Sequence, residues 1–234
     1  MQYFIADDPI ADIYTLSPEE SKHCIKVLRM TTDDQIFITD GNGTLCTARI
    51  INADPKECTV QVINRQLEYH KRNHFLHIAV AVTKNTARIE WFIEKAVEIG
   101  IDEITLLTCD HSERTTQKTD RLEKIITSAM KQSLKTYRPL LNGPTTLIDF
   151  LNQPFNGCKM ICYCEGNNRN SIHQIYSPHQ PALILIGPEG DFSPHEIETA
   201  LNNGYQPVTL GTCRLRTETA ALYATTAINF INEI

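Results

Sequence analysis

The sequence predicts an α/β protein in which a small β-barrel domain precedes a larger domain built on a parallel sheet. Three observations carry this prediction. The segment up to about residue 68 contains short alternating stretches that are typical of antiparallel strands. From Phe75 onward, near-continuous apolar runs alternate with helical patterns, as they do in α/β domains. Two glycine-containing loops near the C-terminus each follow an apolar run and open into a helix.

The N-terminal segment predicts a helix, a hairpin and a further strand. Ser17-Pro18-Glu19-Glu20 has the pattern of a capping box with proline in the first turn, so we expect a helix that ends near Arg29. The turn sequence Asp40-Gly41-Asn42-Gly43 separates apolar runs at 35–39 and 45–51, which indicates a β-hairpin. Residues 58–63 alternate as another strand. Together these elements predict a barrel domain over residues 1–68.

Residues 74–234 predict the second domain, and the polar stretch 65–73 predicts the linker. Near-continuous apolar runs are typical of strands covered on both faces, and therefore of a parallel sheet. These runs span 76–82, 104–107, 160–163 and 182–186. Helical patterns span 88–99, 120–137, 193–204 and 217–231. Ser193 begins a second capping box, and Gly100 and Gly204 stand where two of the helices should end.

Composition argues against several classes of protein. No apolar run in the 234 residues approaches the length that spans a bilayer, and the N-terminus lacks the pattern of a signal peptide. We therefore expect a cytoplasmic protein that does not bind membranes. The eight cysteines are scattered and are expected to be reduced thiols. The best metal candidates are Cys158, Cys162 and Cys164. We expect no metal, because Cys162 and Cys164 would share one face of a strand, a poor geometry for zinc.

Charge is distributed unevenly along the chain. The net charge is −6, whereas a protein that binds nucleic acid is usually basic. Residues 71–140 nevertheless carry 12 basic and 9 acidic side chains, while the segments before and after them are acidic. Such local positive charge suits a face that contacts phosphates. A charge run of this kind is also typical of an ordinary solvated helix face.

The two C-terminal loops indicate a ligand site. Residues 186–193 read IGPEGDFS, and residues 210–220 read LGTCRLRTETA. In α/β sheets, ligands bind beyond the carboxyl ends of the strands, where such loops gather. Neither loop has the spacing of the common phosphate-binding motifs. Their glycines would let main-chain groups approach a flat neutral ring, and Glu189 and Glu218 favour a cationic ligand. One such loop alone could equally be a tight turn, but its recurrence after a second strand favours a site.

These loops resemble those of the ribosomal RNA small subunit methyltransferase E family, a branch of the knotted SPOUT methyltransferases. The family's I-G-P-E-G-G-[FL]-S-x-x-E pattern appears at 186–196, with Asp191 in place of the second glycine. Its L-G-x-x-[IV]-L-R-[TA]-E-T-A-x pattern appears at 210–221. The resemblance extends upstream to the sequence EKAVEIG at 94–100 and to the turn Ser112-Glu113-Arg114, and it covers essentially the whole chain.

The resemblance implies a fold, an activity and partners. The first domain would be a PUA-like RNA-binding domain, and the second a SPOUT domain whose final helix passes through an earlier loop in a trefoil knot. The protein would form a homodimer. It would use S-adenosylmethionine to methylate N3 of a uridine in 16S ribosomal RNA, either as RNA alone or within the small ribosomal subunit. Small residues on the last helix, such as Ala221 and Ala224, suit either a core or a dimer contact.

By resemblance, the S-adenosylmethionine site comprises both loops and a third loop after Tyr163. The residues implied are Cys164, Glu165, Ile186, Gly187, Pro188, Glu189, Gly190, Leu210, Gly211, Cys213, Leu215, Arg216, Thr217 and Ala220.

Methylation of the uridine N3 requires removal of a weakly acidic proton, so a base and a charge-stabilising cation are expected nearby. Glu218 is the candidate base, with Glu189 as the alternative. Arg216 and Arg114 are the candidate cations, although hydrogen bonding within the loop is an equally open role for Arg216. Candidate RNA contacts are Lys84, Arg88, Arg114, Lys131, Lys135 and Arg138. Lys135 stands where the family often has arginine, so we expect a looser contact there.

Two other functions remain open on the sequence. A non-catalytic RNA-binding protein could keep the barrel with a degenerate methyltransferase fold, but both loops retain their glycines. A ribose 2′-O-methyltransferase of a sister SPOUT branch would usually carry an asparagine-rich sequence in the last loop. Residues 216–220 read RTETA instead.

Overall fold

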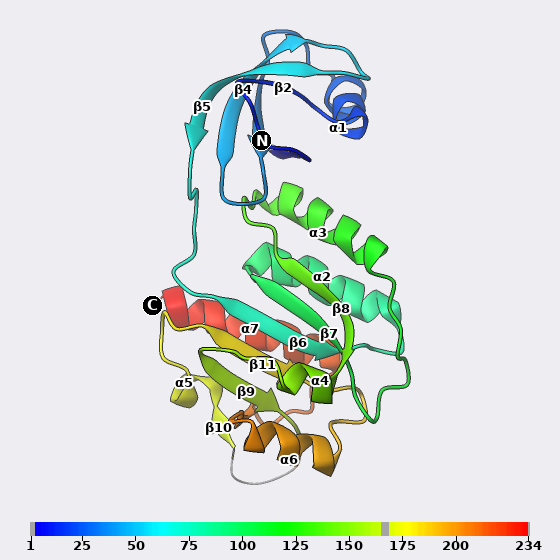
Figure 1. Ribbon diagram of the computed structural model, residues 1–234, viewed down its shortest axis with the longest axis vertical. Coiled ribbons are helices and arrows are strands. Elements are labelled where there is room, and N and C mark those ends of the chain that lie inside the picture. Colours follow the sequence, from blue (N-terminus) through cyan, green and yellow to red (C-terminus); the bar gives the residue numbers. More distant parts are fainter. Residues whose placement is uncertain (1–2, 165–168, 234) are drawn as a thin grey trace. The chain divides into compact units, whose positions relative to one another are not determined.

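The computed structural model describes residues 3–164 and 169–233 (Figure 1). The chain divides into two compact units. One contains residues 1–71 and 127–138, and the other contains residues 72–126 and 139–234. The two units are described separately below.

The first unit is built on a curled five-stranded sheet with the order β1-β3-β4-β5-β2 (Figure 1). Its strands are β1 (Tyr3–Ile5), β2 (Ile13–Thr15), β3 (Gln35–Thr39), β4 (Leu45–Asn52) and β5 (Thr59–Gln66). The predicted hairpin is confirmed: β3 and β4 pair antiparallel, with Thr39 opposite Leu45. β1 pairs parallel to β3, and the other pairs are antiparallel.

The predicted N-terminal helix begins as expected and ends slightly earlier. It consists of α1 (Pro18–Lys22) and the π-helical segment η1 (His23–Val27). The hydroxyl of Ser17 accepts a hydrogen bond from the Glu20 N–H at 3.4 Å, so Ser17 caps the helix. The Glu20 carboxylate forms an ion pair with Lys131 instead of returning to the cap. Arg29 has a φ of +58°, and so cannot continue a right-handed helix.

The core of the first unit lies between its sheet and this helix. Alternate residues of the strands, such as Ile36, Ile38 and Val60, are buried together with Cys24 of η1 and Leu16. The period of two predicted from the sequence therefore gives the sheet one apolar face.

The second unit is built on a seven-stranded sheet in which all pairs are parallel, with the order β10-β12-β9-β11-β6-β7-β8. Its strands are β6 (Leu76–Ala81), β7 (Glu103–Thr108), β8 (Leu140–Thr146), β9 (Cys158–Cys162), β10 (Asn170–Ser171), β11 (Ala182–Ile186) and β12 (Gln206–Thr209). The four predicted apolar strands are confirmed. Every residue of β6 and β11 is buried, as expected for strands covered on both faces.

Helices pack on both faces of the parallel sheet. They are α2 (Thr86–Ile99), α4 (Leu147–Leu151), α5 (Ile172–Ile175), α6 (Pro194–Asn202) and α7 (Thr217–Glu233). A further helix, α3 (Thr119–Ser133), is divided between the two units, since its residues from Thr127 onward belong to the first. α2 packs against α7, which contacts β6 and β11, whereas α4 packs against α6 and β7 (Figure 1). α3 ends at Ser133 and not near Tyr137, because Leu134 adopts a φ of +56°.

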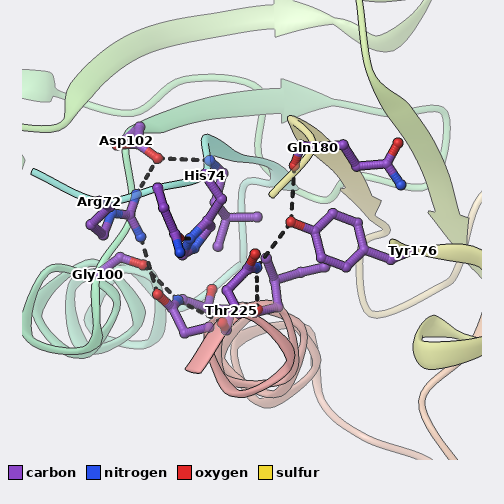
Figure 2. Close-up of polar contacts among 12 residues, drawn as sticks. Arg72, His74, Gly100, Asp102, Tyr176, Gln180 and Thr225 are labelled. Atoms are coloured by element: carbon purple, nitrogen blue, oxygen red, sulfur yellow. Dashed lines mark hydrogen bonds and ion pairs between the residues drawn. The ribbon is translucent and has the colours of Figure 1, made fainter. Parts of the chain in front are cut away.

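A polar network fixes the start of the second unit to the C-terminal helix (Figure 2). The Arg72 guanidinium donates hydrogen bonds to Asp102 and to the Asn229 side-chain oxygen. Asp102 also accepts from the Leu76 N–H at 2.7 Å, and Asn229 donates to the Gly100 carbonyl at 2.8 Å. The chain entering β6, the end of α2 and the middle of α7 are therefore joined by buried and half-buried polar groups.

Three further observations concern membrane-spanning helices, the cysteines and metal sites. In the described ranges, no helix is both long and apolar enough to cross a bilayer. All eight cysteines are free. The prediction that Cys162 and Cys164 share one face of a strand is wrong, because β9 ends at Cys162 and Cys164 lies beyond it. No group of three or more His, Cys, Asp or Glu side chains among the described residues is placed to hold a metal ion.

Candidate active site

A cavity of about 730 Å³ lies at the carboxyl ends of three neighbouring strands of the parallel sheet, β9, β11 and β12. This volume lies within the range of small-molecule and cofactor sites. Three loops line it, one after each strand. The lining includes 13 of the 14 predicted cofactor residues, namely Cys164, Ile186, Gly187, Pro188, Glu189, Gly190, Leu210, Gly211, Cys213, Leu215, Arg216, Thr217 and Ala220. The remaining residue, Glu165, lies outside the described residues.

The loop after β11 contains two glycines that are packed against protein atoms. A Cβ at Gly187 would come within 3.1 Å of the Phe192 ring, and a Cβ at Gly190 would come within 3.0 Å of the His111 Cβ. The sequence interpretation gave these glycines the role of admitting a ligand. In the structure Gly190 lines the cavity, and its missing side chain also makes room for His111.

The loop after β12 leads into α7. Gly211 has a φ of +115°, a conformation that other residues rarely adopt, and no described atom lies within 4 Å of a Cβ built there. The Thr209 hydroxyl closes this turn by donating to the Gly211 carbonyl at 3.0 Å. At the first residue of α7, the Thr217 hydroxyl donates to the Gly187 carbonyl at 3.0 Å. The loop after β11 and the loop after β12 are therefore joined directly.

The segment after β9 contributes Cys162, Tyr163 and Cys164 to the cavity. The Cys164 N–H donates to the Asp191 carboxylate at 2.7 Å. Burial raises the pKa of the Cys164 thiol, and the neighbouring Asp191 carboxylate raises it further. Arg169 donates to the Tyr163 carbonyl, and its guanidinium lies 5.7 Å from the centroid of the Tyr163 ring.

A cation lies between the two carboxylates singled out in the sequence. Arg88 of α2 approaches Glu189 (Nη1 to Oε1, 3.6 Å) and Glu218 (Nε to Oε1, 3.7 Å). The side chain of Glu218 is 10% exposed, and its Oε2 has no hydrogen-bond partner among the described residues. Glu218 also lies in the first turn of α7, where the helix dipole favours negative charge. Glu218 is not among the residues that line the cavity, so its buried oxygen lies behind the lining contributed by the neighbouring residue Thr217.

The segment after β7 supports the cavity from outside. The ring Nδ1 of His111 lies 3.1 Å from the Gly190 carbonyl and 3.0 Å from the Asp191 carbonyl, so this nitrogen must donate. The Ser193 hydroxyl donates to Asp110 at 2.6 Å, and the Asp110 N–H donates to Glu196 at 2.9 Å. These contacts hold the loop after β11 and the start of α6 in place.

The predicted RNA-contacting side chains differ in their surroundings. Lys84 is 72% exposed and pairs with Glu113 (Nζ to Oε2, 2.6 Å). The Arg114 Nε donates to the Thr116 carbonyl, and Arg114 is not among the residues that line the cavity. In the first unit, Lys131 pairs with Glu20, and Arg138 donates to the Thr127 hydroxyl at 2.9 Å. Lys135 follows the end of α3 and also belongs to the first unit.

Several residues that line the cavity were not among the predicted cofactor residues. They are Cys162, Tyr163, Arg169, Asp191, Val208, Thr209, Thr212 and Arg214. Thr212 and Arg214 lie within the second loop and Thr209 directly precedes it, so taking the whole loop and one residue before it would have found them. Arg169 gives no such signal, because it lies in an ordinary polar stretch of the sequence.

Comparison with known proteins defines the class to which this fold and site belong. Residues 70–229 match the RNA methyltransferase domain family, and residues 16–63 match the RNA methyltransferase PUA domain family. The first match covers more than half of the chain. The chain therefore belongs to the RNA methyltransferase family, in the group of ribosomal RNA small subunit methyltransferase E.

Individual relatives match along their whole length. A probable rRNA-methyltransferase of Porphyromonas gingivalis, known from a crystal structure, is 40% identical with a TM-score of 0.93, and the match covers 100% of this chain and 99% of that one. A methyltransferase of Legionella pneumophila, solved with the bound cofactor SAM, is 27% identical with a TM-score of 0.86 and coverage of 99% and 97%. Ribosomal RNA small subunit methyltransferase E of Buchnera aphidicola is 28% identical, over 96% of this chain and 91% of the relative.

Proposed function

We propose that this protein transfers a methyl group from S-adenosylmethionine to N3 of a uridine in 16S ribosomal RNA of the small subunit. One observation carries the proposal: the loops after three neighbouring strands enclose a single cavity lined by main-chain groups and by Glu189, Asp191 and Arg216. The relative solved with bound SAM has the same fold over 99% of this chain. The names of the curated relatives support ribosomal RNA of the small subunit as substrate.

We propose the same cofactor-binding residues that the sequence predicts, of which Cys164 is the first and Ala220 the last along the chain. S-adenosylmethionine carries a sulfonium cation, and the anionic side chains of Glu189 and Asp191 in the lining suit a cation. Methyl transfer is an in-line displacement, so holding the donor methyl and the acceptor nitrogen in line is the main contribution of the protein. The loops are joined by the contacts of Thr217 and Asp191, which supports such positioning.

For the chemical step we propose Glu218 as the base that takes the N3 proton. Its buried and unpartnered Oε2 supports this role over Glu189, whose Oε1 already accepts from the Lys84 N–H at 3.3 Å. Arg216 lines the cavity and would stabilise negative charge on the uracil oxygens. Glu218 is not among the lining residues, although it directly follows two of them, Arg216 and Thr217, along the chain. Arg88, predicted as a phosphate contact, instead approaches both carboxylates and would orient them.

For the RNA we propose that both parts of the chain contribute. Residues 1–68 would act as a PUA-like RNA-binding domain, supported by the match to the PUA model, and residues 74–234 as the SPOUT catalytic domain. Lys84, Arg114, Lys135 and Arg138 would contact phosphates. Lys131 would contribute less, because its ion pair with Glu20 would have to break first.

We further propose a trefoil knot around α7, a homodimer and a cytoplasmic location. Tyr223 and Phe230 of α7 and Trp91 of α2 are large exposed apolar side chains on two helices that pack together, which supports a dimer contact there. Sedimentation velocity tests the dimer: a single species of twice the chain mass is expected, and a monomer at micromolar concentration would contradict it.

The function is tested with purified protein, S-adenosylmethionine labelled in its methyl group, and small ribosomal subunits or naked 16S RNA. The modified RNA is digested to nucleosides, which are separated by chromatography and identified by mass spectrometry. We expect the label in 3-methyluridine. Label in 2′-O-methyl nucleosides would point to the sister activity, and binding of RNA without any transfer would point to a non-catalytic protein.

A further inference from the structure

Asp191 adopts a backbone conformation that usually calls for glycine, with a φ of +64°. It stands where the motif described above carries a second glycine. Unlike a glycine, it has a carboxylate that contacts both the segment after β9 and the next residue of its own loop. Oδ2 accepts the Cys164 N–H at 2.7 Å, and Oδ1 accepts the Phe192 N–H at 2.9 Å.

The main chain of Asp191 makes a third connection. Its carbonyl accepts a hydrogen bond from the His111 ring at 3.0 Å. Segments that follow β7, β9 and β11 therefore meet at one residue. Two of these segments, represented by Cys164 and by Asp191 itself, line the cavity.

We propose that Asp191 is a positioning residue, whose carboxylate holds the segment after β9 against the loop after β11 and so preforms one wall of the S-adenosylmethionine site. This inference rests on the proposed function. A wall fixed before binding reduces the ordering cost that the ligand must offset. A hydrogen bond to a charged acceptor is stronger than a neutral one, so a single carboxylate is sufficient for this role.

The substitution Asp191→Gly isolates the carboxylate. Glycine adopts a positive φ without strain, so the backbone is kept while both side-chain hydrogen bonds are lost. We expect the Kd for S-adenosylmethionine, measured by calorimetry, to rise about tenfold. We expect kcat at saturating cofactor to fall by a smaller factor than the Kd rises, because saturation with cofactor offsets the cost of ordering the wall. Asp191→Asn keeps one acceptor oxygen, so its Kd for S-adenosylmethionine should lie between those of the wild type and Asp191→Gly.

A second measurement requires no cofactor. Asp191 raises the pKa of the exposed Cys164 thiol, so its removal should increase the thiolate fraction of Cys164 at pH 8. Alkylation followed by peptide mass spectrometry should show severalfold faster labelling of Cys164 in Asp191→Gly. Cys213, the other exposed thiol, is the internal control and should label at an unchanged rate.

Faster labelling together with a raised Kd supports the inference. An unchanged Kd, a fall in kcat that matches the loss of affinity, or an unchanged labelling rate would each overturn it. If the wild-type protein fails to bind S-adenosylmethionine, the proposed function falls and the cofactor role of Asp191 falls with it. The labelling result would still report whether Asp191 contacts the segment after β9.

Discussion

At the scale of single residues, Glu218 and Glu189 have different surroundings, although the side chains of both lie close to the Arg88 guanidinium. Glu189 lies on a loop and accepts a main-chain hydrogen bond from Lys84. Glu218 lies in the first turn of α7, is nearly buried, and leaves Oε2 without a partner among the described residues. A buried oxygen of this kind costs free energy unless a ligand uses it.

Glu218→Gln is expected to lower kcat about 100-fold or more, because an amide cannot take the N3 proton. The Kd for S-adenosylmethionine should change less than threefold, since the amide keeps the volume of the side chain. Steady-state kinetics and calorimetry measure the two effects. Glu198→Gln, at an exposed position of α6, is the matched control. Normal turnover in Glu218→Gln would remove this residue from the chemistry.

Gly190→Ala separates two explanations of the same glycine. Because the added Cβ would meet the His111 Cβ at 3.0 Å, we expect a loss of stability of about 1–3 kcal/mol in the absence of any ligand. Urea unfolding followed by the fluorescence of Trp91, the single tryptophan, measures this in the second unit. A protein of unchanged stability that binds S-adenosylmethionine weakly would favour the ligand-approach interpretation instead.

At the scale of elements, the start of α6 is a joint between the helix and the segment after β7. The capping box of Ser193 and Glu196 is complete, and the Ser193 hydroxyl also donates to Asp110. Ser193→Ala is expected to lower the free energy of unfolding by about 1–2 kcal/mol. Ser171→Ala at the half-buried cap of the short helix α5 should cost less, because among the described residues its hydroxyl bonds only to those of its own helix. Equal losses in the two variants would show that the link to Asp110 has no energetic weight.

The sequence was sufficient for elements that have an uninterrupted physical signal. β6 and β11 are buried on both faces, so their apolar runs identify them. β8 was not predicted, because it is an edge strand whose exposed residues include Gly143 and Pro144, which seldom occur in strands. The short helix α4 was missed for a similar reason: five residues are too few to display a helical period.

Most of the cavity could also be predicted, because its residues lie in continuous loops that follow apolar strands. Contacts between distant segments could not. Nothing in the sequence around Arg88 indicates that it lies between Glu189 and Glu218. Its role as a phosphate contact stays a prediction. The pairing of Lys131 with Glu20, 111 residues apart, is hidden for the same reason.

At the scale of the whole molecule, acid stability should depend on a buried histidine of the central sheet. Burial lowers the pKa of His77 to about 4, and its Nε2 lies 2.8 Å from the Thr105 hydroxyl. In the unfolded chain the pKa of this histidine is near 6.5. Between about pH 4 and pH 6.5 the unfolded state therefore binds a proton that the folded state does not bind. Stability should therefore fall as the pH drops from about 6.5 to about 4, and the loss from this residue should level off below that.

The size of the effect follows from the two pKa values and is roughly 3 kcal/mol. His77→Gln keeps a partner for Thr105 and cannot become charged in this range. Urea unfolding at pH 7 and pH 5, followed by Trp91 fluorescence, should therefore show a smaller decline in the variant than in the wild type. Both proteins carry the same carboxylates, so the difference between the two declines reports the replaced histidine. Parallel declines would contradict the account of His77.

The central claim, that this molecule uses its three-loop cavity to methylate a uridine of the small-subunit RNA, is tested most directly in cells. Mass spectrometry of nucleosides from 16S RNA would compare cells that lack this protein with cells complemented by the wild type or by Glu218→Gln. We predict that 3-methyluridine is absent without the protein, returns with the wild type, and stays near background with the variant. Undiminished 3-methyluridine in cells that lack the protein would contradict the account.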